Sequence, residues 1–252
     1  MKKLIIPCVA AAFAASYAFA APADDVKAAA KKLADAQNYT WTTQTQNAGG
    51  QGGGFGGGAV TGMAEKGGFT MTTRETQNGP MQTVRKGEQM VMQRDGQWVT
   101  REEMMAQFGG GQGGGQGGQG GQRAGQRGGM FGAVNPAEEV TALVDSAKDF
   151  KAADGAIVGT LTDEAIAQRL SFGGRGGQGG GQPAAAPKNA SGSVKFWVKD
   201  GALTKYELNV KGTMTGRDGQ ERQIDRTTTT EIKDIGTTKV NVPADAKKKL
   251  DA

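Results

Sequence analysis

The sequence contains few of the side chains that usually carry enzyme chemistry. Its 252 residues include no histidine and a single cysteine, Cys8. Without an imidazole there is no histidine general base, no histidine metal ligand and no serine–histidine or cysteine–histidine nucleophile pair. Most hydrolase and zinc-enzyme designs are thereby excluded. We therefore expect a protein that is not an enzyme and that needs no cofactor.

Paired carboxylates are the next candidates for chemistry, and they include residues 24–25, 102–103 and 138–139. Adjacent residues on a helix point in different directions, and acidic residues near a helix start favour the helix dipole. No calcium loop of the D-x-D-x-D-G type is present. The pairs therefore favour a structural use, and we expect no metal site.

Arginine–glycine motifs at residues 126–129 and 174–177 resemble the segments that bind single-stranded nucleic acid by stacking and phosphate contacts. Here the arginines are few and no aromatic cluster accompanies them. The balance of 30 Lys+Arg against 25 Asp+Glu leaves a formal net charge of only +5. We expect no nucleic-acid partner.

The N-terminal segment is typical of an export signal. Two lysines precede an apolar stretch over residues 4–19, and an A-x-A pattern ends at Ala20. We expect residues 1–20 to be a signal peptide cleaved after Ala20, and a periplasmic or secreted protein that makes at most transient membrane contact. A membrane anchor is the alternative, but the stretch is short and Ala-rich for a span of about 20 apolar residues.

Three glycine-rich tracts interrupt the rest of the chain, at residues 48–58, 109–132 and 173–190. Such tracts lose much backbone entropy on ordering and bury little side chain. We interpret them as flexible, disordered loops inserted into one domain that spans residues 21–252.

The segments between the tracts predict an α+β fold. Helical spacing occurs over residues 24–37, 101–108, 136–147 and 163–170. Six short strand patterns follow the first helix, over residues 39–43, 59–63, 69–76, 81–85, 89–93 and 97–100, and another lies at 155–161. Long alternating strands fill residues 193–242, before Pro243 and a small terminal helix.

Three turns of basic-Asp-Gly type, at residues 94–96, 199–201 and 217–219, join strand patterns. We favour three-residue loops with a left-handed glycine, because this register pairs Val198 with Ala202 and puts the apolar side chains on one sheet face. In the first hairpin, the same register groups Met90, Met92 and Trp98. In the third, it groups Met214 and Ile224.

The element order and two local motifs give a resemblance to a known family. The segment V-K-F-W-V-K-D-G-A-L-T-K-Y-E-L, residues 194–208, and the segment D-I-G-T-T-K-V-N-V-P, residues 234–243, resemble the periplasmic lipoprotein carrier superfamily of LolA, LolB and LppX-like proteins. The resemblance implies an open antiparallel half-barrel whose concave face is covered by helices. It also implies noncatalytic binding or carriage of a lipid or lipoprotein acyl group in the cell envelope.

A hydrophobic ligand of this kind is held mainly by burial of its methylenes, for which methionine is well suited. The candidate ligand-binding residues are Met71, Met90, Met92, Trp98, Val194, Phe196, Val198, Tyr206, Leu208, Val210, Met214 and Ile224. Arg222 and Arg226 share the predicted inward side and could meet a lipid headgroup.

The same pattern also permits a second hypothesis. Apolar residues on a sheet beneath helices are usually plain core, in which case the protein is an envelope structural or interaction protein. Its glycine-rich loops would then contact envelope proteins or wall polymers. A ligand cavity beside the apolar sheet face would favour the first hypothesis over the second. The sequence alone does not determine the oligomeric state.

Overall fold

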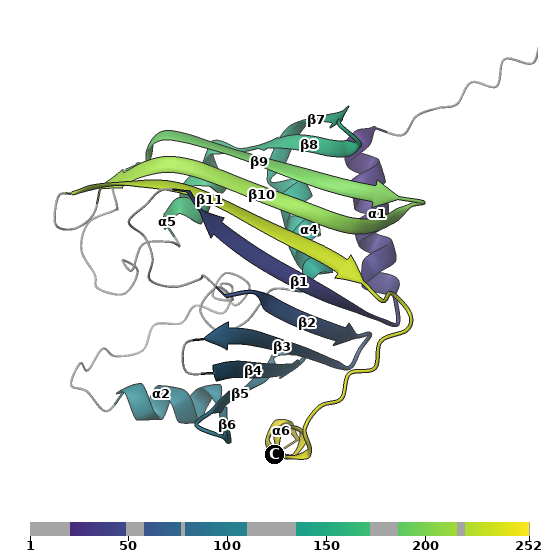
Figure 1. Cartoon of the computed structure of the whole chain (residues 1–252), viewed down its shortest axis with the longest axis vertical. Coiled ribbons are helices and arrows are strands. Elements are labelled where there is room, and N and C mark those ends of the chain that lie inside the picture. Colours follow the sequence, from purple (N-terminus) through teal and green to yellow (C-terminus); the bar gives the residue numbers. More distant parts are fainter. Residues whose placement is uncertain are drawn as a thin grey trace, which may run out of the picture.

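The computed structural model describes residues 21–48, 58–76, 79–109, 135–171, 186–215 and 220–251 (Figure 1). The predicted signal peptide, most of each glycine-rich tract and the turn at residues 217–219 lie outside these ranges. Within the third tract, residues 188–190 form the start of a strand, so the predicted loop ends too late in the sequence.

Eleven strands form one antiparallel sheet. The strands are β1 (Asn38–Asn47), β2 (Val60–Glu65), β3 (Phe69–Thr76), β4 (Gly79–Lys86), β5 (Gln89–Arg94), β6 (Gln97–Thr100), β7 (Ala147–Ala153), β8 (Ala156–Leu161), β9 (Lys188–Lys199), β10 (Ala202–Thr215) and β11 (Glu221–Lys233). Their order across the sheet is β6-β5-β4-β3-β2-β1-β11-β10-β9-β8-β7. The sheet is not closed, because β6 and β7 are its edges, so the α+β class and the open antiparallel sheet are confirmed.

The described helices are α1 (Pro22–Asp35), α2 (Arg101–Gly109), α4 (Pro136–Asp145), α5 (Asp163–Ser171) and α6 (Ala244–Leu250). α1 has a proline in its first turn and two aspartates near its positive end, which favour helix initiation. At the start of α4, the side chain of Asn135 accepts a hydrogen bond from the backbone N–H of Ala137 at 2.9 Å.

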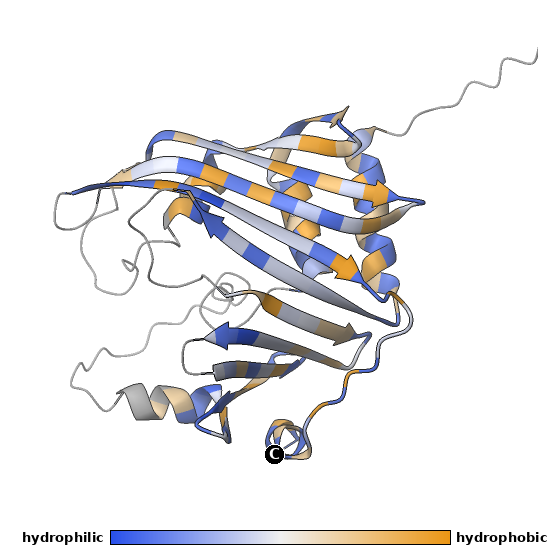
Figure 2. Cartoon of the chain, viewed as in Figure 1, coloured by the Kyte–Doolittle hydropathy of each residue, from blue (hydrophilic) through white to orange (hydrophobic). Residues whose placement is uncertain are grey.

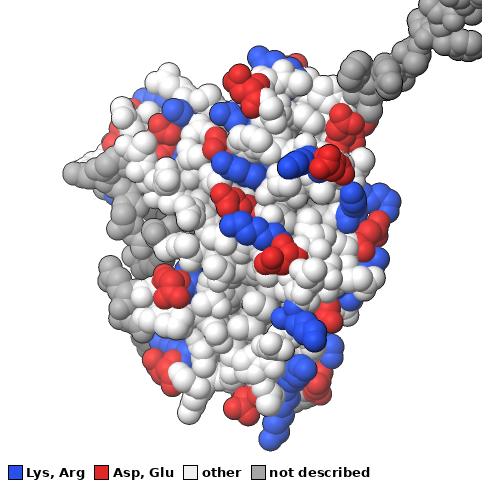
Figure 3. Space-filling model, turned by 45° about the vertical axis from the view of Figure 1, so that its right-hand side comes forward, with Lys and Arg blue, Asp and Glu red and all other residues white. Residues whose placement is uncertain are grey.

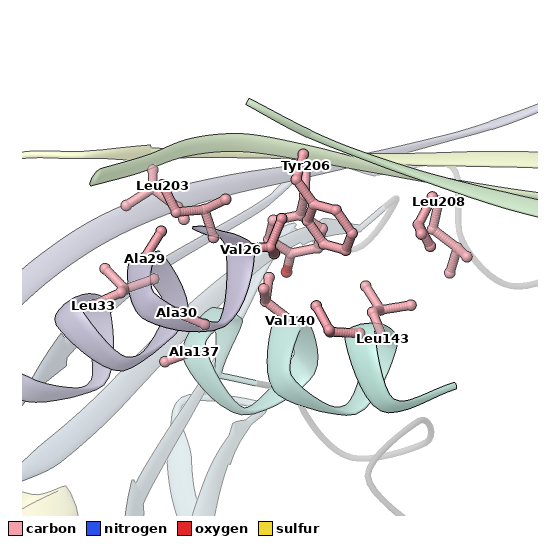
Figure 4. Close-up of a cluster of buried hydrophobic side chains, with 14 of the residues drawn as sticks. Val26, Ala29, Ala30, Leu33, Ala137, Val140, Leu143, Leu203, Tyr206 and Leu208 are labelled. Carbon is pink, nitrogen blue, oxygen red and sulfur yellow. The ribbon is translucent and has the colours of Figure 1, made fainter. Parts of the chain in front are cut away.

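The sheet has two chemically different faces. We call the face that carries Phe196 and Tyr206 the inner face, and the opposite one the outer face. α1 and α4 pack under the inner face of β10, where their apolar side chains meet Leu203, Tyr206 and Leu208 (Figure 4). α5 adds Ile166 and Leu170 to the same cluster of side chains. This cluster is the larger core, and we call it the helix-covered core.

A second, smaller core lies on the outer face, at the other end of the sheet. There Val84, Val91 and Trp98 are buried against Ala246 and Leu250 of α6. In the register, Val84 pairs with Val91, and the neighbouring Thr83 pairs with Met92. Paired residues share a face and successive residues alternate, so Val84 and Val91 lie on the outer face and Thr83 and Met92 on the inner face. The expectation that helices cover only one face is therefore wrong for α6. The apolar residues of α6 pack against the outer face of β4–β6.

The hairpin between β9 and β10 corrects the predicted turn. Lys199 pairs with Ala202 and Val198 with Leu203, so the loop has two residues, and both Asp200 and Gly201 have positive φ. A bulge at Thr204 then shifts the register, so that Phe196 pairs with Tyr206. The predicted shared face is confirmed, but the extra residue lies in β10 rather than in the turn. Figure 2 shows the resulting alternation of hydrophobic and hydrophilic residues along β10.

The hairpin between β5 and β6 contradicts the predicted grouping of Met90, Met92 and Trp98. Its loop also has two residues, but no bulge follows, and Trp98 pairs with Gln93. Trp98 therefore lies on the outer face in the smaller core, whereas Met90 and Met92 point to the inner face. Met71 pairs with Val84 and also lies on the outer face.

Beyond β11, residues 234–243 form no strand, although the sequence predicts strands up to Val242. Asp234 and Gly236 have positive φ, which turns the chain out of the sheet. The N–H of Gly236 then donates to the carbonyl of Asn38 at 2.8 Å, and the N–H of Thr238 donates to the Asn38 side chain at 2.7 Å. This segment is a strap that leads from β11 to α6.

Candidate functional site

The charged residues of the strands are sorted by face. The register places every strand arginine on the inner face: Arg74, Arg85, Arg94, Arg222 and Arg226. The strand lysines, and the strand carboxylates apart from Asp149 at the β7 bulge, lie on the outer face. Outer pairs include Lys211 with Asp225 at 3.0 Å and Lys195 with Glu207 at 3.8 Å. Basic and acidic side chains mix across the face seen in Figure 3.

The inner side chains of β3–β5 belong to neither core. We call eight of them the β3–β5 inner surface, without Thr76 and Arg94 at the strand ends: Thr70, Thr72, Arg74, Met81, Thr83, Arg85, Met90 and Met92. Thr72, Thr83 and Met92 are buried, whereas the two arginines, Met81 and Met90 are half-buried. This surface combines flexible apolar side chains with hydroxyl and guanidinium groups.

Trp41 lies where this surface meets the helix-covered core. In the ladder, Trp41 pairs with Gly62, Gly62 with Thr72, and Thr72 with Thr83. The indole ring lies over Gly62, where an added Cβ would be 2.1 Å from its Cζ2 atom. The Nε1 donor is buried, and within the described part of the chain it has no hydrogen-bond partner. An unpaired buried donor costs free energy, so this group is a candidate for ligand contact.

Most of the sequence-predicted ligand residues lie in the helix-covered core. Val194, Phe196, Tyr206, Leu208 and Val210 are all buried there. At the border of this core, Val198, Met214 and Ile224 are partly buried. The structure thus brings these eight residues together on one face, and their part in ligand binding stays a prediction.

Packing in the helix-covered core is close. Large side chains fit over strand glycines: Phe150 over Gly159, Leu161 over Gly192 and Leu170 over Gly212, where an added Cβ would approach within 2.7, 2.8 and 2.7 Å respectively. Such fits leave no room for a methyl group, as expected of a filled protein interior.

Two tyrosines carry polar groups into this core. The hydroxyl of Tyr206 donates to Glu139 at 2.6 Å, and that of Tyr39 donates to the Asn135 side chain. Burial raises the pKa of Tyr39 to about 12. Burial, together with the neighbouring Glu139 carboxylate, raises the pKa of Tyr206 well above its usual value. Both phenols therefore remain neutral hydrogen-bond donors at physiological pH.

The arginines predicted to face inward do so. Arg226 pairs with Val210 and Arg222 with Met214. The Arg226 guanidinium donates to the backbone carbonyl of Arg169 in α5 at 2.9 Å. Burial, and then the proximity of Arg169, lowers the pKa of Arg226. Arg226 is therefore engaged in holding α5 against the sheet.

Sequence reasoning missed Trp41, Arg74, Arg85 and Met81. Strand alternation puts Arg74 and Thr72 on one face and Arg85 and Thr83 on the same face of the next strand. That signal is present in the sequence. The face that it marks could not be recognised as inner, because the opposite face carries Met71, Val84 and Trp98 and is equally apolar.

The fold defines a class of proteins with an open antiparallel sheet and helices packed on its inner face. Solved structures that are similar to this chain include LprF from Mycobacterium bovis, with a TM-score of 0.44 and 11% identity over 89% of this chain and 97% of that chain. The Mycobacterium tuberculosis lipoprotein LppX has a TM-score of 0.44 and 9% identity over 88% and 98%. A LolA superfamily protein from Nitrosomonas europaea has a TM-score of 0.33 and 8% identity over 88% and 96%.

These matches name the same group of proteins as the resemblance seen in the sequence. No family model matches the sequence, and the search of curated proteins found no match. None of the helices in the described ranges is long and apolar enough to cross a membrane.

Proposed function

We propose that this protein is exported to the cell envelope, where it binds or carries the acyl group of a lipid or lipoprotein without catalysis. The observation that supports the proposal is the β3–β5 inner surface. Its methionines Met81, Met90 and Met92 lie on the inner face of β4 and β5 and belong to neither core. Methionine adapts its shape to varied apolar partners, as an acyl chain requires.

In this proposal the ligand lies on the inner face of β3–β5, and the smaller core supports these strands from the outer face. α1, α4 and α5 pack against β7–β10, while the described contacts of α2 and α6 are with β4–β6. Each methylene of an acyl chain that leaves water contributes about 0.8 kcal/mol. A chain of a dozen methylenes therefore needs apolar area more than directed polar contacts. Export is supported by the signal pattern of residues 1–20.

The experiment is a titration with dansyl-labelled undecanoic acid, whose emission rises in an apolar site. We compare wild-type protein with Met81→Glu and Met90→Glu, and use Gln82→Glu as the matched control. Gln82 is half-buried like Met81 but lies on the outer face of the same strand. Circular dichroism establishes that each variant is folded.

We expect saturable uptake by wild type and by Gln82→Glu. The two methionine variants should bind at least about tenfold more weakly, which corresponds to about 1.4 kcal/mol for a carboxylate placed against the chain. Uptake that is absent from folded wild type, or equal in all four proteins, contradicts the proposal.

A second function is favoured by a different observation. Phe150, Leu161 and Leu170 lie in close contact with strand glycines, as side chains in a closely filled core do. A protein with such a core can serve as an envelope structural or interaction protein. If the titration finds no uptake, this function becomes the better one, and its test is capture of envelope partners by the full chain.

A further inference from the structure

The β3–β5 inner surface contains a cluster of groups that suits an anion. Arg74 follows Thr72 by two residues on β3, and Arg85 follows Thr83 by two residues on β4. Because the strands are antiparallel and Thr72 pairs with Thr83, the arginines emerge on opposite sides of this threonine pair. Arg74 and the residue that pairs with Arg85 are four positions apart on β3, which is roughly 14 Å along the strand.

The charges of these arginines are not balanced by nearby protein carboxylates. Among the described residues, neither Arg74 nor Arg85 forms an ion pair. The acidic residues of β2 and β3, Glu65 and Glu75, pair with Asn38 and Pro80 on the outer face. Along β2–β5 the inner-facing charges are therefore all positive.

Neutral donors lie in the same row. Thr72 and Thr83 are 7% and 4% exposed, and Trp41 is 2% exposed with its Nε1 unpartnered. The ladder places Trp41, Gly62, Thr72 and Thr83 in succession across four strands, so the indole donor is at one end of the threonine row. These groups can complete the hydrogen bonding of an anion that two guanidinium groups attract.

The use of arginine rather than lysine fits this chemistry. A guanidinium is more weakly hydrated than an ammonium, so it tolerates a half-buried position, and its planar fork binds carboxylate or phosphate in a bidentate manner. Arg94 and Arg226 are engaged by Asp95 and by the carbonyl of Arg169 respectively. On β2–β5, Arg74 and Arg85 are therefore the arginines that a ligand can use.

We propose that Arg74, Arg85, Thr72, Thr83 and the Trp41 indole bind the anionic headgroup, carboxylate or phosphate, of an acyl lipid whose chain lies along Met81, Met90 and Met92. This inference rests on the proposed function and names the ligand class more closely. The protein thus selects acidic acyl lipids over neutral ones of equal length.

The test compares two probes that differ only in the phosphate: 1-palmitoyl lysophosphatidic acid and 1-palmitoylglycerol. Isothermal titration at monomeric lipid concentrations gives the affinity of each probe for wild type, Arg74→Gln, Arg85→Gln and the double variant. Lys211→Gln is the charge-matched control, because it also removes one positive charge but lies exposed on the outer face. Inorganic phosphate is the third probe.

Wild type and Lys211→Gln should bind the phosphate lipid at least about tenfold more tightly than the glyceride, as expected for hydrogen bonds to a charged group. The double arginine variant should lose this preference while retaining its affinity for the glyceride. The wild-type preference should also shrink between low and high salt, and this comparison does not depend on the folding of a variant.

Three results would overturn the inference. Equal affinity of wild type for both lipids would contradict the headgroup site but not the binding of the acyl chain. A preference that persists in a folded double variant moves the site elsewhere. Inorganic phosphate binding as tightly as the phosphate lipid shows a free-anion site rather than a headgroup site. If neither lipid binds at all, the proposed function itself fails.

Discussion

At the scale of single residues, strand glycines decide how closely the core packs. Gly62 is the most constrained, because the Trp41 ring occupies the space that a side chain would need. The same close approach fixes the indole at the end of the threonine row. A small change at Gly62 therefore tests both the packing and the position of the candidate donor.

We predict that Gly62→Ala destabilises the protein by about 1 to 3 kcal/mol, as overpacking a filled core does. Urea unfolding measures the free energy of unfolding. Gly68→Ala is the control, since its Cβ would meet only the flexible side chain of Glu65, at 3.2 Å. Equal stability of the two variants would show that Trp41 moves freely.

The buried phenol of Tyr39 predicts a loss of stability in alkali. Its pKa is about 12 in the folded protein, against about 10 when unfolded. A raised folded pKa means that stability is complete below pH 10 and is lost as pH rises towards 12. The full loss amounts to up to about 3 kcal/mol. Tyr39→Phe should flatten this slope in urea unfolding between pH 9 and 12, and an unchanged slope contradicts the assignment.

At the scale of elements, the β9–β10 hairpin depends on one bulge. Thr204 is the extra residue, since Val198 pairs with Leu203 and Trp197 with Lys205. Leu203 and Tyr206 are three positions apart, an odd number, so regular alternation would put them on opposite faces. The bulge lets both of them face the helices.

Deletion of Thr204 should therefore be tolerated, because Leu203, Lys205 and Tyr206 then alternate regularly. The expected cost is about 1 kcal/mol, from the hydrogen bond that Thr204 donates to the Trp197 carbonyl. Deletion of Glu207 should instead prevent folding, since it moves half of the apolar set to the outer face. Thermal unfolding distinguishes the two, and similar losses would show that the bulge does not set the register.

The same hairpins show what the sequence can predict. Apolar alternation identified the strands. The shared face of Phe196 and Tyr206 was predicted correctly, because one extra residue puts both side chains on the same face whether it lies in the turn or in β10. Trp98 was placed wrongly because its hairpin has the short turn without the bulge. The inner positions of Arg74 and Arg85 follow from the ladder that joins β3 and β4 through β2 and β1 to β11, and no local pattern encodes this long-range pairing.

At the scale of the whole molecule, two cores lie on opposite faces of one sheet. The helix-covered core holds β1 and β8–β11, while α6 and the outer face of β4–β6 form the smaller core. The β1–β2 ladder joins the two ends within the sheet, and the strap carries the chain from one end to the other. The surface proposed for ligand lies on the other side of the strands that α6 supports.

Leu250→Ala should lower the stability of β3–β6 selectively. Leu250 is buried in the smaller core, and truncating a buried leucine costs about 2 to 5 kcal/mol. Hydrogen exchange should show faster amide exchange in β3–β6 with little change in β9 and β10. The exposed Lys248 gives the control Lys248→Ala. A uniform increase across the sheet would show that the two cores unfold together.

The measurement that tests acyl binding most directly is native mass spectrometry of the protein purified from its own envelope without detergent, followed by lipid extraction. We predict a stoichiometric adduct with the mass of an acidic acyl lipid, which is lost in folded Met90→Glu and retained in Gln82→Glu. A ligand-free mass that takes up no added 1-palmitoyl lysophosphatidic acid or 1-palmitoylglycerol would contradict acyl carriage.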